Sequence, residues 1–109
     1  MKVLSLLAAT AAMFAFSMTA GAAVDADAAA KALKDNGCTK CHSVDKAKKG
    51  PAFKKVAADL KGKPDAEAKL TTFLTTGPKV KMDDGTQEEH RIVKDPAAVR
   101  NLVQFILAQ

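Results

Sequence analysis

Large aromatic side chains are scarce in this sequence. It has no tryptophan and no tyrosine, and its 109 residues include only five phenylalanines. Because bases commonly stack on aromatic rings when proteins bind single-stranded nucleic acid, this composition argues against such binding. A small chain with few large side chains also has little with which to fill a core. It therefore commonly needs a disulfide, a metal or a cofactor for stability.

Long apolar runs are also missing, with one exception at the N-terminus. Segment 3–18 is apolar apart from three hydroxyl residues, whereas 27% of the whole chain is charged. The run is shorter than the roughly 20 residues that a membrane-spanning helix needs. Lys2 precedes it, and Ala20-Gly21-Ala22 follows as a small-residue cleavage site. This pattern is typical of a secretory signal peptide.

The signal peptide sets the expected domain organisation. Residues 1–22 are the cleaved signal and residues 23–109 form one domain, with cleavage after Ala22 or Ala23. The net charge falls from +5 to +4 because Lys2 leaves with the signal. We expect export to a bacterial periplasm as a monomer, with no stable membrane insertion of the mature chain.

Four helices are predicted in the mature segment, because apolar residues recur there at helical spacing between turn residues. They run from Ala28 to Lys34, from Phe53 to Leu60, from Ala66 to Leu74 and from Pro96 to Ile106. We expect Asp25 or Asp27 to cap the first helix, Asp65 the third and Asp95 the fourth. The fourth has the clearest apolar stripe and is expected to pack across the first.

Between the last two helices, residues 79–94 show no helical stripe. They contain Asp83-Asp84-Gly85, which is a turn signal. No strand pattern or internal repeat is evident here or elsewhere, so the predicted fold class is all-α with an irregular loop. Loops of this length in compact domains are usually functional.

Both cysteines lie in one short motif, Cys38-Thr39-Lys40-Cys41-His42. A C-x-x-C-H run predicts covalent attachment of a c-type haem, because two thiols at this spacing can add to its two vinyl groups. The adjacent imidazole of His42 can then ligate the iron. A buried porphyrin would also supply the apolar mass that the sequence lacks.

Three other interpretations compete with haem attachment. A redox disulfide between Cys38 and Cys41 is typical of a thioredoxin-like βαβ pattern, which this sequence does not show. A zinc site needs four ligands, and outside the motif only His90 remains as a histidine. A chance motif on an exposed loop is the third. Export, small size and helical patterning together favour haem.

With these features the mature chain resembles the class I c-type cytochromes over nearly its whole length. The resemblance rests on a helix leading into Cys38-Thr39-Lys40-Cys41-His42, then Gly50-Pro51-Ala52-Phe53, then a last helix ending Phe105-Ile106-Leu107. It implies an all-α cytochrome c-like fold of about four helices around one covalent haem c with its iron. It also implies that the carbonyl of Pro51 accepts a hydrogen bond from His42, which would orient the ring.

The sequence departs from this family at the second axial ligand. Class I cytochromes usually place a methionine there, beside a proline and before the last helix. This chain offers Met82 and His90 in that region, and neither precedes a proline. His90 is nearer the last helix and is followed by apolar residues, so we favour His90, with Met82 as the alternative. An open or otherwise occupied position is the third option.

Two filled axial positions leave no place for a substrate, so this site favours one-electron transfer between redox proteins, not catalysis. The alternative function is a haem enzyme or a ligand sensor with an open or labile distal position. A purely structural role would be the remaining interpretation only if no haem were attached.

Positive charge is concentrated around the motif. Residues 31–63 hold ten lysines and three acidic residues. A basic surface near a haem would steer the protein to redox partners with acidic docking surfaces. The alternative is an ordinary solvated surface. Nucleic acid is not an expected partner.

Overall fold

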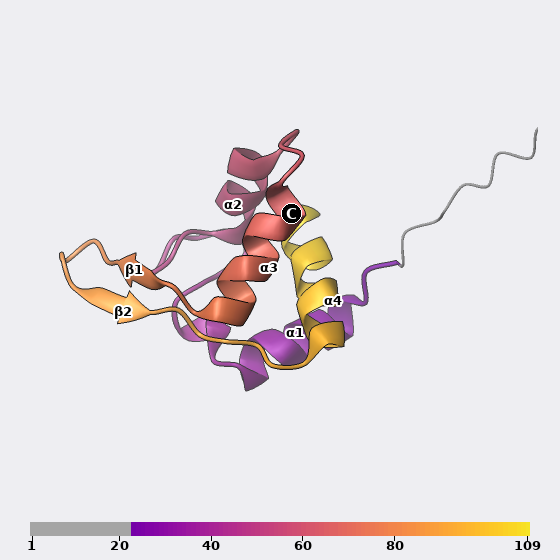
Figure 1. Cartoon of the computed structure of the whole chain (residues 1–109), viewed down its shortest axis with the longest axis horizontal. Coiled ribbons are helices and arrows are strands. Elements are labelled where there is room, and N and C mark those ends of the chain that lie inside the picture. Colours follow the sequence, from indigo (N-terminus) through magenta and orange to yellow (C-terminus); the bar gives the residue numbers. More distant parts are fainter. Residues whose placement is uncertain (1–22) are drawn as a thin grey trace, which may run out of the picture.

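The computed structural model describes residues 23–109, and the predicted signal peptide lies outside the described residues. The chain is mostly helical (Figure 1). In chain order its elements are α1 (Ala26–Asp35), the 3₁₀ turn η1 (Cys38–Lys40), α2 (Phe53–Leu60), α3 (Ala66–Thr76), β1 (Lys79–Lys81), β2 (Gln87–Glu89) and α4 (Pro96–Leu107). The prediction of four helices is confirmed, with boundaries that differ by up to two residues.

Aspartates cap two of the helices as expected. An Asp25 carboxylate oxygen accepts from the Ala28 amide at 2.9 Å, and one of Asp95 accepts from the Ala97 amide at 3.0 Å. The prediction for α3 is wrong in detail. Asp65 occupies the N-cap position, but its side chain accepts no capping hydrogen bond and instead lies 3.4 Å from Lys69 Nζ.

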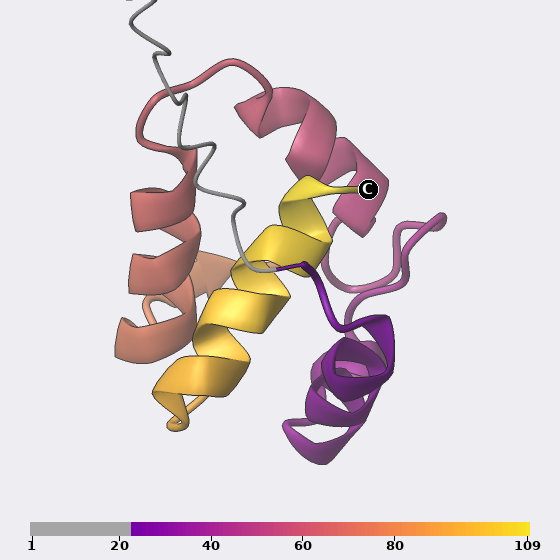
Figure 2. The same ribbon diagram turned by 90° about the vertical axis from the view of Figure 1, so that its right-hand side faces the viewer.

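Helix α4 is the centre of the core. It packs against α1, α2 and α3, as Figure 2 shows, so its predicted packing against the first helix is confirmed. Asn101 on α4 exchanges two hydrogen bonds of 2.9 and 2.8 Å with the backbone of Asp25 before α1. The buried core consists of Ala29, Leu33, Cys38, Phe53, Leu74, Val93, Val99, Leu102, Val103 and Ile106.

The irregular loop predicted after α3 contains a β-hairpin instead. Strands β1 and β2 pair antiparallel, with Val80 opposite Glu88. Such short strands carry too few apolar residues to show alternation, so no strand signal is visible in the sequence. The turn was visible, however. Asp84 accepts hydrogen bonds from the amide and hydroxyl of Thr86, and Gly85 has a φ of 84°, which favours glycine.

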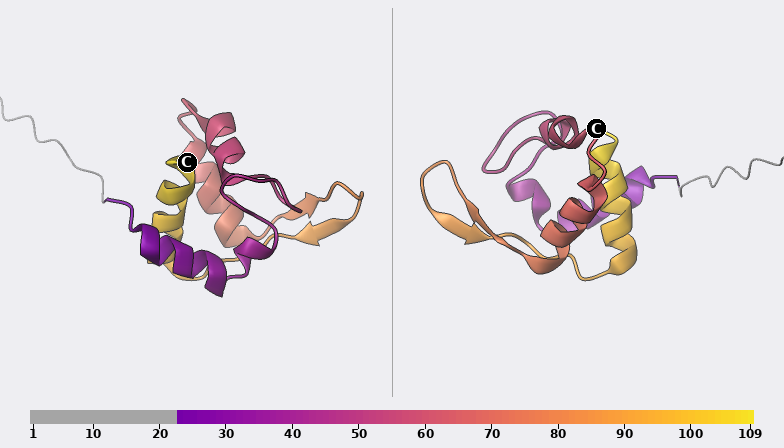
Figure 3. Two further views of the ribbon diagram at one scale, coloured as in Figure 1. Left: turned by 180° about the vertical axis from the view of Figure 1, so that it is seen from behind. Right: turned by 45° about the horizontal axis from the view of Figure 1, so that its top comes forward.

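The hairpin projects away from the helices on the same side as the loop that follows the C-x-x-C-H motif (Figure 3). Hydrogen bonds from the Thr86 hydroxyl and amide chiefly lower the pKa of Asp84 at the hairpin tip, and the charge of Lys49 on that loop lowers it slightly further. Two loops far apart in sequence therefore lie on one side of the molecule. Within residues 23–109, no helix is long and apolar enough to cross a membrane.

Candidate haem site

The C-x-x-C-H motif lies in the tight turn η1 directly after α1. Gly37 begins the turn with a φ of 70°, and the amides of Cys41 and His42 both donate to the carbonyl of Cys38, at 3.1 and 2.9 Å. Residues three apart eclipse one another in 3₁₀ geometry. This geometry brings the cysteines onto one face of the turn and carries the chain directly into His42.

The two thiols have different environments. Cys38 is buried, Cys41 is half-buried, and both are free. Burial raises the pKa of the Cys38 thiol, and its backbone hydrogen bond and the Arg91 guanidinium oppose that rise. The side chain of Cys38 is therefore largely shielded from water inside the core.

The ring of His42 is fixed by three neighbours. Its Nδ1 lies 2.7 Å from the carbonyl oxygen of Pro51, and Phe53 stacks on the ring at a centroid distance of 5.1 Å. A Cβ at Gly50 would lie 2.5 Å from Cε1 of the imidazole, so only glycine allows this approach. Since a carbonyl oxygen only accepts, Nδ1 carries the proton and Nε2 keeps its lone pair.

Backbone hydrogen bonds tie the loop that carries these neighbours to the motif. The Gly50 amide donates to the Cys41 carbonyl at 2.8 Å, and the Phe53 amide donates to the Ser43 carbonyl at 2.9 Å. The side chain of Lys48 donates to the Thr39 carbonyl at 2.6 Å. The loop is therefore closed on the motif by local contacts.

His90 lies opposite His42, although 48 positions separate them in the sequence. The two ring centroids are 6.1 Å apart and the planes are inclined by 55°. Nδ1 of His90 donates to the carbonyl of Arg91 at 3.0 Å, which again leaves Nε2 with its lone pair. Burial lowers the pKa of His90; the hydrogen bond to Arg91 opposes this, and His42 lowers the pKa further.

This pair suits a metal held between two imidazoles. Because a metal–imidazole bond is about 2 Å long, rings that ligate one ion from opposite sides have centroids roughly 6 Å apart. The observed 6.1 Å matches that spacing, and both histidines are oriented through Nδ1 by carbonyl oxygens. The residues present therefore fit an iron with two imidazole ligands.

Met82 belongs to the turn of the hairpin. Its amide donates to the Thr86 carbonyl at 2.8 Å, and its carbonyl accepts from the Gly85 amide at 3.0 Å. The side chain is half-buried. Of the two predicted distal ligands, His90 is the one with an observed ring contact to His42, at a centroid distance of 6.1 Å.

Several residues of this site were missed by the sequence analysis. Phe53 is expected to begin a helix and belongs to the Gly50-Pro51-Ala52-Phe53 motif, but its stacking on His42 was not predicted. Phe73 contacts His90 edge to face at a centroid distance of 5.5 Å. Arg91 provides the carbonyl for His90, and its guanidinium lies beside Gly37. Proximity to Pro51 could have indicated Phe53, but no local signal pointed to the others.

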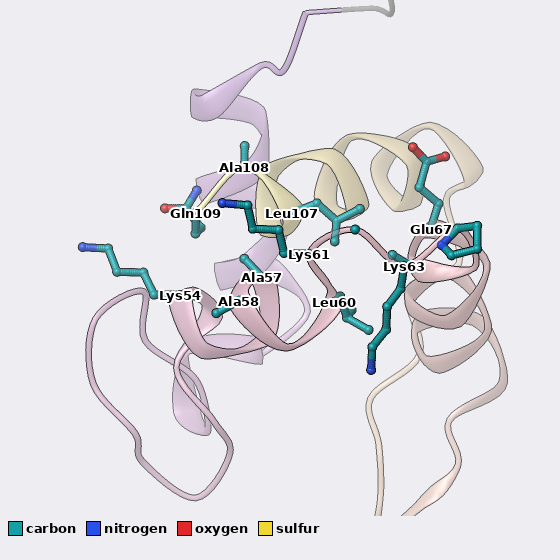
Figure 4. Close-up of a pocket in the computed structure, with 13 residues that line it drawn as sticks. Lys54, Ala57, Ala58, Leu60, Lys61, Lys63, Glu67, Leu107, Ala108 and Gln109 are labelled. Carbon is teal, nitrogen blue, oxygen red and sulfur yellow. The ribbon is translucent and has the colours of Figure 1, made fainter.

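A separate groove lies at the other end of α2, where it meets the ends of α3 and α4 (Figure 4). Its volume is about 680 Å³, and Leu60 and Leu107 line it together with Lys54, Lys61 and Lys63. It contains none of the predicted site residues. Over residues 23–109, no three histidine, cysteine or acidic side chains gather as a metal site would require.

Comparisons with known proteins identify solved structures that share this architecture. The structure resembles the crystal structure of the class 1 cytochrome MtoD from Sideroxydans lithotrophicus ES-1, with 50% identity and a TM-score of 0.76, over 79% of this chain and 97% of that one. It also resembles cytochrome c552 from Nitrosomonas europaea, with 28% identity and a TM-score of 0.59, over 72% and 95% of the two chains.

Two curated relatives match part of the sequence. Cytochrome c-551 of Pseudomonas aeruginosa is 42% identical over 45 residues, 41% of this chain and 43% of that protein. Cytochrome c-551 of Pseudomonas denitrificans is 46% identical over 47 residues, 43% of this chain and 57% of that protein. The matches thus span about half the length of these relatives.

The family model for cytochrome c matches residues 26–109, which is nearly all of the described chain. The resemblance suggested by the motif and the helix pattern is confirmed. The chain therefore belongs to the cytochrome c family, whose members are electron carriers and not enzymes, and its cofactor is one covalently bound haem c.

Proposed function

We propose that this chain is a one-electron carrier whose haem is attached through Cys38 and Cys41 and ligated by His42 and His90. The observation that carries the proposal is the facing pair of half-buried imidazoles, 6.1 Å apart, each with Nε2 available. Haem iron supplies the redox couple, and the protein supplies ligands, burial and a docking surface. With both axial positions filled by side chains, no position remains for a substrate.

The proximal side is supported by the contacts around His42. The carbonyl of Pro51 fixes the tautomer and the orientation of the imidazole, and Phe53 covers one of its faces. A hydrogen bond of this kind also raises the basicity of the ligating nitrogen. Cys38, which begins η1, and Cys41, which follows it, would anchor the porphyrin next to this ligand.

The distal side is supported by the contacts of His90. Its hydrogen bond to the Arg91 carbonyl selects the tautomer in which Nε2 is free, and burial favours the neutral imidazole that binds metal. Met82 is the alternative ligand. Because methionine raises the reduction potential of a cytochrome c relative to histidine, the choice decides the potential range in which the carrier works.

Matched substitutions separate the two ligands. In the purified ferric holoprotein, His90→Ala should convert the low-spin absorption spectrum to a high-spin one, and added imidazole should restore the low-spin form. Met82→Leu keeps a similar apolar volume and should leave the spectrum unchanged. The reverse pattern, with spectral loss only in Met82→Leu, would contradict ligation by His90.

The same spectra test the competing function. A wild-type ferric protein that is already high-spin, and that binds added cyanide rapidly, would favour a haem enzyme or sensor with an open distal position. A low-spin wild type that binds cyanide slowly is the result expected of an electron carrier.

We also propose that lysines near the motif guide acidic redox partners. Lys40 lies in η1, and Lys49 lies on the loop that follows the motif. Lys61 and Lys63 form part of the groove at the far end of α2 (Figure 4). Lys40 and Lys49 therefore lie near the haem motif, whereas Lys61 and Lys63 lie at the groove.

These two lysine pairs provide a matched test. Oxidation of the reduced protein by ferricyanide, an anionic reagent, should slow more in Lys40→Gln/Lys49→Gln than in Lys61→Gln/Lys63→Gln. The difference should shrink as salt is added, because screening weakens steering. Equal rates for both double variants would indicate that the lysines are only a solvated surface.

Export to the periplasm is a further part of the proposal. It is supported by the charge, apolar run and cleavage pattern of residues 1–22. Cell fractionation and N-terminal sequencing should find a periplasmic protein that begins at Ala23 or Val24. A cytoplasmic protein that retains Met1 or Lys2 would contradict export.

A further inference from the structure

The C-terminal end of α3 lies against the segment that carries His90. The ring of Phe73 meets the His90 ring edge to face, with centroids 5.5 Å apart and planes inclined by 81°. One turn further on, Gly77 ends the helix with a φ of 59°. Between them, the carbonyl of Leu74 accepts a hydrogen bond from the Val93 amide at 2.8 Å. Three residues of α3 and its cap thus contact residues 90–93.

Gly77 makes the closest of these approaches. A Cβ there would lie 2.7 Å from the backbone oxygen of His90 and 2.9 Å from Cγ1 of Ile92. The first atom belongs to the backbone and cannot rotate away, so any side chain at Gly77 would displace the peptide of His90. The absence of a side chain at this position therefore determines how near His90 can lie to α3.

The hairpin explains why His90 reaches this place. Lys79 pairs with Glu89, and the next amide, that of His90, donates to the Pro78 carbonyl at 2.9 Å. The ladder of β1 and β2 therefore continues to the end of α3. Because Gly77 directly precedes this pairing, the helix end and the hairpin determine the backbone position of His90 together.

The side chain of Phe73 has a different environment from a core residue. It is 43% exposed, although the next residue, Leu74, is buried in the core. Its ring contact with a half-buried imidazole restricts how that imidazole can turn. The hydrogen bond from Nδ1 to the Arg91 carbonyl also restricts this rotation.

From these contacts we infer that Phe73 and Gly77 are positioning residues for the distal imidazole, with Gly77 fixing its backbone and Phe73 its ring orientation. This inference rests on the proposed ligation by His90. Outer residues that orient a metal-bound histidine tune the metal through it. Changes at either position should therefore alter the electronic state of the iron while the covalent attachment remains intact.

Gly77→Ala can be compared with a closely matched control, Gly62→Ala. Gly62 also follows a helix and has a φ of 76°, but a Cβ there would meet nothing within 4 Å. Both variants carry the cost of a side chain at positive φ, but only Gly77→Ala also displaces His90. Low-spin g values from electron paramagnetic resonance and the reduction potential are the readouts, because a loss of stability alone does not change them.

In the holoprotein, Gly77→Ala should change the g values and shift the ratio of reduced to oxidised protein at a fixed electrode potential at least threefold. Gly62→Ala should match the wild type in both readouts. Identical g values and potentials in folded Gly77→Ala, Gly62→Ala and wild type would overturn the role of Gly77.

Phe73 gives a second test that does not depend on the folding of Gly77→Ala. Phe73→Leu keeps an apolar side chain but removes the ring, so it should change the g values. Phe73→Tyr keeps the ring and should preserve them. Wild-type g values in Phe73→Leu would overturn the orienting role of Phe73.

The wild-type spectrum separates failure of this inference from failure of the proposed ligation. A far-red absorption band from methionine sulfur on iron would overturn His90 as ligand, and the positioning role with it. A wild type that depends on His90 for its low-spin state, combined with unchanged Gly77→Ala and Phe73→Leu variants, would overturn the positioning role alone.

Discussion

The two histidines of the proposed haem site are held in different ways. His42 lies in a loop that short-range backbone hydrogen bonds close on its own motif, with Pro51 and Phe53 as immediate neighbours. His90 follows a hairpin of two three-residue strands and is held against the end of α3. Local sequence thus builds the proximal side, whereas the distal side depends on contacts between segments.

The two sides are also expected to differ in local stability. A two-stranded hairpin is marginally stable by itself, and β1 and β2 pair chiefly with each other. The proximal loop instead leads into α2, whose Phe53 belongs to the buried core. We therefore expect the proximal side to be the more rigid one, and the distal side to be the one that substitutions can retune.

Substitution of the anchoring and ligating residues should show the largest difference in effect between the proximal and distal sides. Cys38→Ala or Cys41→Ala should impair formation of stable holoprotein, and His42→Ala should leave no normal low-spin centre. His90→Ala should keep its covalent haem, because it contributes to neither thioether bond. Haem staining of denaturing gels measures this retention. Normal covalent haem in Cys38→Ala or Cys41→Ala would contradict the attachment scheme.

Two glycines provide a smaller perturbation on each side. Gly50→Ala forces a Cβ to within 2.5 Å of the His42 ring, so it should lower the free energy of unfolding by about 1–3 kcal/mol and change the haem spectrum. Gly85→Ala, at the hairpin turn, meets nothing within 4 Å. It should cost about 1–2 kcal/mol through its positive φ and leave the spectrum unchanged.

Chemical denaturation with parallel absorption spectra measures both effects of these glycine substitutions. If Gly85→Ala altered the haem spectrum as strongly as Gly50→Ala, the hairpin turn would be coupled to the iron more tightly than its contacts indicate.

Amide hydrogen exchange should show the expected difference in rigidity directly. The Gly50 and Phe53 amides, which bond within the proximal loop, should exchange more slowly than the Met82 and Gly85 amides of the hairpin. We expect a difference on the order of tenfold or more, because local opening of the hairpin breaks few contacts. Equal amide exchange rates in the two loops of the holoprotein would contradict the expected difference in rigidity.

The smallest expected effect is a pH dependence confined to the hairpin. Hydrogen bonds from Thr86, and more weakly the charge of Lys49, hold the pKa of Asp84 below its usual value. The ionised carboxylate therefore favours the folded turn, and this contribution is lost as the pH falls through the lowered pKa. The Thr86 amide resonance should follow that titration, while the Gly50 amide, bonded to a carbonyl, should not.

The sequence predicted the proximal side far better than the distal one. The helices and the motif follow from patterns within a few residues, because capping, helical spacing and the C-x-x-C-H turn are local. The hydrogen bond between His42 and Pro51 was implied by the family resemblance and not by a local pattern. Asp65 was wrongly predicted to cap α3 by its side chain, because cap chemistry depends on a rotamer that sequence does not specify. The hairpin went unpredicted because Val80 alone gives no alternation.

The contacts of His90 could not be predicted from the sequence, for a physical reason. Phe73 and Gly77 meet it only because the chain returns along the hairpin to α3, and no periodicity encodes that return. Position before the last helix favoured His90 over Met82 as a ligand, but it gave no information on what holds the ring.

The central claim is that His90 and not Met82 completes the iron site. The most direct measurement is the far-red absorption of the purified wild-type ferric holoprotein, where methionine sulfur on iron gives a weak band. With His90 as the ligand, the spectrum should be low-spin and lack that band. A low-spin spectrum that contains the band would assign the ligand to Met82 and contradict the claim.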